Sequence, residues 1–140
     1  MLRLAKVITM LLAAGLGQAA LAQSESKIPL ELNRLEQAGE TCRVYLLVKN
    51  PDPAAIEAFK LDLVFFDNDG VIRTRLYVEL GPLAPTKTAV RLFDVPKAQC
   101  SELASILVND VVTCTDPAGA KLSCLNRLEL SSKATAKLEY

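Results

Sequence analysis

The sequence of 140 residues contains no histidine and no tryptophan. Without histidine, the chain lacks the commonest general base and the commonest transition-metal ligand, so Ser–His–Asp and Cys–His catalysis are excluded. The four cysteines stand far apart, and the sequence contains neither a C-x₂₋₄-C pair for zinc nor a C-x-x-C redox motif. We therefore expect no enzyme activity, no metal site and no cofactor.

Glycine is also sparse, with six residues in the whole chain. The glycines after residue 22 stand singly in expected turns, so none belongs to a glycine-rich cradle for phosphate. Asp67, Asp69 and Gly70 resemble part of a calcium-binding loop, but Phe65 and Leu76 occupy the positions of its first and last carboxylates. A solvated turn is the better interpretation of these acidic residues.

Neither sign of charge is in excess, because 16 basic residues balance 16 acidic ones. The sequence also has no basic cluster. Nucleic acid and an anionic membrane surface are therefore poor candidates for a partner.

Only one long apolar run occurs, from residue 7 to residue 16, and it is too short to span a bilayer. Arg3 and Lys6 precede the run, and Ala20 and Ala22 follow it in a small-x-small arrangement. This pattern predicts a secretory signal peptide over residues 1–22, with a signal anchor as the alternative. Residues 23–140 then form one periplasmic or secreted domain, with its core over about residues 28–130 and no stable membrane insertion after cleavage.

The cysteines of this exported domain predict two disulfides, because their number is even. Three pairings are possible. Cys100 and Cys114 flank one expected strand, whose length would hold them too far apart to bond. If the strands reverse direction at each connection, Cys42 and Cys100 meet at one end of the domain. This favours the pairs Cys42–Cys100 and Cys114–Cys124.

The clearest secondary-structure signal is a hairpin over residues 61–80. Apolar and polar residues alternate in both arms, which predicts two strands with one buried face. Leu61, Leu63 and Phe65 define that face in the first arm. Asn68 to Gly70 tolerate the positive φ that a tight turn requires.

Similar alternation predicts further strands on either side of the hairpin. They cover residues 28–33, 42–50, 88–93 and 104–114, with a bulge or strand end at Asn109–Asp110. Pro29 suggests that the first of them is an edge strand. Residues 122–131 fit either a strand or a helix, and residues from 132 onward are expected to fray.

Six or seven short strands separated by turns predict an all-β, antiparallel, immunoglobulin-like β-sandwich with two disulfides. The segments 48–50, 61–67, 70–72, 80–83 and 88–93 resemble the FxLYD-type immunoglobulin-like domains of exported bacterial proteins. The mature chain is also similar to small periplasmic proteins of proteobacteria. The resemblance implies an immunoglobulin-like fold, and it assigns no chemistry and no site residues.

Apolar, aromatic and basic residues on the faces expected to point outward suggest a binding surface. Interface cores favour such residues when they lie together, although the same residues can also form a second covered face or an ordinary solvated one. The candidate binding face comprises Tyr45, Val64, Phe66, Arg73, Arg75, Tyr77, Arg91 and Phe93.

These features favour a non-enzymatic module that binds another cell-envelope protein through a sheet face or an exposed edge strand. An inhibitor or accessory subunit of an envelope hydrolase is an alternative, with the loop over residues 81–87 as its contact. A small-ligand carrier is a further alternative.

Overall fold

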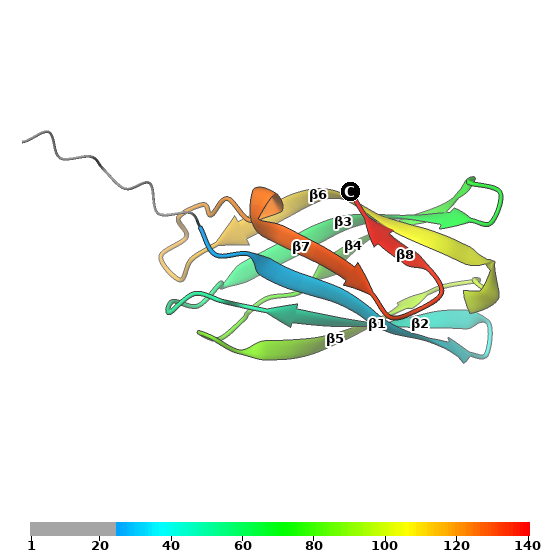
Figure 1. The fold of residues 1–140 in the computed structure, drawn as a ribbon, viewed down its shortest axis with the longest axis horizontal. Helices are drawn as coiled ribbons and strands as arrows, with labels where there is room; N and C mark the ends of the chain where they lie inside the picture. The colour runs from blue at the N-terminus through cyan, green and yellow to red at the C-terminus, as the bar shows by residue number, and fades with distance from the viewer. Residues whose placement is uncertain (1–24) are drawn as a thin grey trace, which may run out of the picture.

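The computed structural model describes residues 25–140, which form two four-stranded sheets packed face to face (Figure 1). The predicted all-β sandwich with two disulfides is confirmed. The predicted signal peptide over residues 1–22 lies outside the described residues. The strands are β1 (Ile28–Ala38), β2 (Thr41–Lys49), β3 (Ala58–Asp67), β4 (Ile72–Glu79), β5 (Thr88–Val95), β6 (Leu103–Thr115), β7 (Leu128–Ser132) and β8 (Lys137–Glu139).

The first sheet has the strand order β5-β2-β1-β7, and the second has the order β4-β3-β6-β8. Neighbouring strands are antiparallel except for the pairs β1–β7 and β6–β8, which are parallel. The two sheets bury a shared apolar core between them, in which Phe59 and Leu63 on β3 are fully buried. Among the described residues, no helix is long and apolar enough to cross a membrane.

The central hairpin is confirmed as β3 and β4. Gly70 has a φ of 76° at the turn, and its N–H donates to the Asp67 carbonyl at 3.0 Å. Leu61, Leu63 and Phe65 face the core as predicted. In the second arm, the register shifts between Phe65 and Phe66, and Ile72 faces outward and is 60% exposed.

Two predictions about strand positions are wrong. β1 is not an edge strand, since it lies between β2 and β7, and Pro29 precedes its first pair with β2 at Leu30. The end of the chain is not frayed, because β8 pairs with β6 and buries Leu138. This additional strand makes eight in the described residues, whereas the alternation predicted six or seven.

Two ambiguous segments are resolved. Residues 122–131 contain a short 3₁₀ turn, η2 (Leu125–Arg127), which leads directly into β7. The irregularity at Asn109–Asp110 is a bulge inside β6, where the register against β3 shifts between Asp62 and Leu63.

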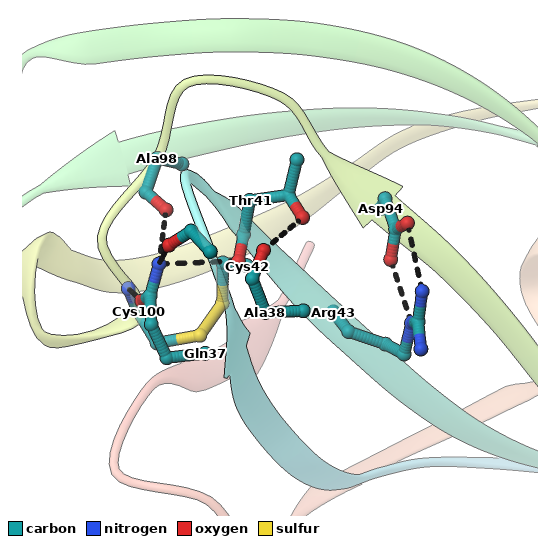
Figure 2. Close-up of a disulfide and its surroundings, with 9 residues drawn as sticks. Gln37, Ala38, Thr41, Cys42, Arg43, Asp94, Ala98 and Cys100 are labelled. Atoms are coloured by element: carbon teal, nitrogen blue, oxygen red, sulfur yellow. Dashed lines mark hydrogen bonds and ion pairs between the residues drawn. A yellow bond between two sulfur atoms is a disulfide. The ribbon is translucent and has the colours of Figure 1, made fainter.

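Both predicted disulfides are present. Cys42 and Cys100 have Cα atoms 5.0 Å apart, and Cys114 and Cys124 have theirs 6.2 Å apart. Figure 2 shows Gln37 beside the first bond, where it accepts from the Cys100 N–H at 2.7 Å. Two disulfides indicate an oxidising, extracytoplasmic compartment.

Candidate functional site: the free edge of strand β5

The structure divides the predicted binding face between different surfaces. Val64, Phe66, Arg75 and Tyr77 lie together on the outer face of the second sheet, and Arg73 stands in the bulge beside them. Tyr45, Arg91 and Phe93 belong to the first sheet. The eight predicted residues therefore do not form one patch.

The assignment of Phe93 to an outer face is wrong. It pairs with the buried Val44, and its ring meets that of Phe65 edge-on at 6.2 Å between centroids. The outward position predicted for Arg91 is also wrong, because Arg91 lies on the same side of β5 as Phe93 and its side chain reaches the Leu80 carbonyl. Val90 and Leu92 point outward instead and are 52% and 51% exposed. The sequence was misleading here because β5 has apolar residues at both its odd-numbered and its even-numbered positions. Alternation therefore did not distinguish the two faces of the strand.

The outer face of the second sheet is organised by a buried carboxylate. Asp62 is only 2% exposed and accepts two hydrogen bonds from Arg75, at 2.7 and 2.6 Å. Asn109, in the β6 bulge, donates to the same carboxylate at 2.6 Å. The hydrogen bonds from the Arg75 guanidinium lower the pKa of Asp62 below its usual range. Burial acts in the opposite direction and raises this pKa, whereas the hydrogen bond from Asn109 lowers it further. Arg75 also lies 5.4 Å from the Tyr77 ring centroid, so its charge is already engaged.

One edge of the first sheet differs, because strand β5, which forms it, is bonded to a neighbouring strand on one side only (Figure 1). The Asn50 N–H donates to the Lys87 carbonyl, and the register continues from this pair without a shift. Antiparallel pairs alternate between bonded and non-bonded positions, so Ala89, Arg91 and Phe93 bond to β2. The backbone N–H and C=O groups of the alternate residues therefore face away from the sheet. We call this set the β5 edge: Thr88, Val90, Leu92 and Asp94.

The β5 edge carries exposed apolar side chains beside backbone groups that no neighbouring strand bonds. Val90 pairs with Leu47 and Leu92 pairs with Tyr45, which together extend an apolar strip onto β2. At one end of the strip, Arg43 and Asp94 form two hydrogen bonds of 2.8 and 3.1 Å, visible in Figure 2. The edge has no proline and no bulge. Edges of this kind readily accept another strand.

Strand β4 forms an edge of the second sheet, and its charged residues protect this edge against further pairing. The Leu80 N–H donates to the Phe59 carbonyl, and the same alternation leaves a different set of β4 residues facing outward. Charged side chains on an edge strand discourage further pairing. The outward-facing residues of β4 are Arg73, Arg75, Tyr77 and Glu79, of which three are charged.

Arg91 lies at the middle of β5 and bridges the two sheets. Its Nε donates to the Leu80 carbonyl at 2.8 Å, and its Nη2 donates to the Pro82 carbonyl at 2.9 Å. Its Nη1 donates to the carbonyl of Val90 on the β5 edge at 3.1 Å. The guanidinium is therefore held in place beside the free edge.

Two other features of the described residues offer little chemistry. A hollow of about 440 Å³ beside the Cys114–Cys124 bond has Lys121 as its only titratable side chain. Within residues 25–140, no three His, Cys, Asp or Glu side chains gather as metal ligands would. The loop over residues 81–87 is held to the body, since Leu83 and Ile56 exchange backbone hydrogen bonds of 2.8 and 3.0 Å.

No family model matches the chain, and no curated protein matches it. Among solved structures, the chain is similar to IrmA from Escherichia coli, with a TM-score of 0.58 and 13% sequence identity. The similarity covers 76% of this chain and 92% of that one. At this level of identity, the comparison shows that the two proteins share a fold.

Proposed function

We propose that this chain is an exported, non-enzymatic module that binds another protein of the cell envelope. The β5 edge accepts an extended segment of that protein as an additional strand. The observation that carries the proposal is the combination of backbone groups that no strand bonds with the exposed side chains of Val90 and Leu92. Added strands gain affinity from main-chain hydrogen bonds and specificity from alternate side chains.

The rest of the molecule supports this role. The Cys42–Cys100 bond and the ion pair between Arg43 and Asp94 hold the start of β2 and the end of β5 in place. A rigid edge loses little conformational entropy when a segment binds. The two disulfides also suit a protein that acts in the periplasm.

The proposal is tested by site-specific photo-cross-linking in intact cells. A photoreactive side chain at position 92 should yield a cross-link to an extended segment of one envelope protein. The same group at Tyr77, on the charged β4 edge, should yield none. Equal yields at both positions, or none at position 92, would overturn the proposal.

A proline variant then tests the strand geometry with the partner identified in this way. Leu92→Pro removes a backbone N–H that faces away from β2, so the β2 ladder remains intact. Tyr77→Pro removes the equivalent free N–H from the β4 edge and is the matched control. We expect only Leu92→Pro to weaken binding, with similar unfolding midpoints for both variants. Unchanged binding by Leu92→Pro would contradict strand addition.

A further inference from the structure

We infer that Arg91 determines the specificity of the β5 edge by selecting an added strand that carries a carboxylate opposite it, between two apolar residues. This inference rests on the function proposed above and specifies the chemistry of the partner. It also assigns a role to the positive charge of Arg91, which forms no ion pair within the described residues.

Arg91 differs from every other arginine in residues 25–140 in its charge partners. The others each form an ion pair with a carboxylate of this chain, namely Arg34 with Glu36, Arg43 with Asp94, Arg73 with Glu102, Arg75 with Asp62 and Arg127 with Asp52. Arg91 is held only by backbone carbonyls, which carry no net charge. Its positive charge is therefore fixed at the edge without a neutralising group among the described residues.

The guanidinium retains donors for a ligand. It has five N–H groups in a planar fork, and the three carbonyls use three of them, one each on Nε, Nη1 and Nη2. Two N–H groups remain for an incoming acceptor. A carboxylate is the preferred partner of such a fork because the hydrogen bonds are then charge-assisted.

The geometry of strand addition places a side chain within reach of Arg91. The Val90 carbonyl, which accepts from Arg91, keeps a second lone pair for the N–H of an added strand. An antiparallel strand that bonds to the backbone of Val90 and Leu92 has a residue directly opposite Arg91, in a pair without mutual hydrogen bonds. The Cβ atoms of such a pair lie about 4.5–5.5 Å apart, and both side chains point to the same side of the sheet. The two flanking residues of the added strand point to the other side, where they meet Val90 and Leu92.

The same geometry disfavours a second copy of this chain as the occupant. If two copies of β5 pair so that Val90 faces Leu92 in both directions, Arg91 lies directly opposite itself. Like charges in that position are destabilising. An acidic residue between apolar ones is the complementary pattern.

The test uses three synthetic octapeptides of alternating threonine and valine that are identical except for Glu, Gln or Lys at one central position. Each is titrated into the isotope-labelled, disulfide-bonded mature protein, and amide shifts and hydrogen exchange are followed by NMR. We expect the Glu peptide to protect the amides of Val90 and Leu92 and to bind about fivefold more tightly than the Gln peptide. The Lys peptide should bind most weakly.

A charge-reversal variant gives the complementary measurement. Arg91→Glu should reverse the order of the Glu and Lys peptides. Its unfolding midpoint is checked because three hydrogen bonds are lost, and the wild-type series tests the inference even if this variant fails to fold. Protection of β5 amides by all three peptides with equal affinity would overturn the role of Arg91 and leave strand addition intact. Failure of every peptide to protect these amides at millimolar concentration would count against both proposals.

Discussion

The guanidinium of Arg75 donates two hydrogen bonds to the Asp62 carboxylate, with Nε–Oδ1 and Nη2–Oδ2 distances of 2.7 and 2.6 Å. The two residues face outward on neighbouring strands, yet Asp62 is almost fully buried. Asn109 completes the arrangement because the β6 bulge aims its amide at the same carboxylate. A buried charge that is held in this way makes stability depend on pH.

The Asp62 pKa is lowered in the folded protein, first by the hydrogen bonds from Arg75. Its contribution to stability is therefore complete above its unfolded pKa of about 3.9 and is lost as the pH falls through the folded value. Asp62→Asn should reduce the free energy of unfolding near neutral pH, and its difference from wild type should shrink below about pH 4. Urea unfolding at a series of pH values measures this difference.

Asp94→Asn is the matched control, since Asp94 also pairs with an arginine and its pKa is lowered by the hydrogen bond from Arg43. This pair is exposed, so solvent and salt screen it. We expect a smaller loss of stability and stronger salt sensitivity than for Asp62→Asn. An equally large effect at Asp94 would show that burial of Asp62 is unimportant.

The two disulfides should differ in their contribution because they close loops of different length. The Cys42–Cys100 bond spans 58 positions and the Cys114–Cys124 bond spans 10. Chain entropy predicts that replacing both cysteines of the longer loop by serine costs about 4 kcal/mol, and about 3 kcal/mol for the shorter loop. Denaturant unfolding of the two double variants tests this order. A reversed order would mean that packing around the shorter bond outweighs loop length.

Local patterns predicted much of this fold. The β3–β4 hairpin followed from alternation and from the turn at Gly70, because both depend on residues that are close in sequence. The cysteine pairing followed from the direction of the chain between Cys42 and Cys100. These features required no knowledge of which strands lie side by side.

The candidate site could not be found in the same way. Whether β5 has a free edge depends on the order of strands in the sheet, and that order is set by distant packing. Alternation was also uninformative between Leu92 and Phe93, since both are apolar. The signal available in the sequence was that residues 88–95 contain neither proline nor lysine. This observation is informative only once the strand is known to lie at an edge.

Alanine substitutions at Leu92 and Phe93 distinguish the binding side of β5 from its core side. Phe93→Ala should cost about 2 kcal/mol because it removes a ring packed against Phe65. Leu92→Ala should change stability by less than about 0.5 kcal/mol, since its side chain is half exposed. Thermal and urea unfolding measure both values. Comparable losses at the two positions would contradict the orientation of β5.

The C-terminal strand should stabilise the second sheet despite its short length. β8 pairs with residues 105–107 of β6 and contains the buried Leu138, and Ala136 just before it is also buried. A chain that ends at residue 135 exposes this part of β6, so we expect a loss of about 2 kcal/mol and faster amide exchange at residues 105–107. A chain that lacks only Tyr140, which is 72% exposed, is the control and should match the full-length protein. Unchanged stability and exchange in the shorter chain would mean that the end of the chain is frayed, because a docked strand cannot be removed without exposing the apolar surface that it covers.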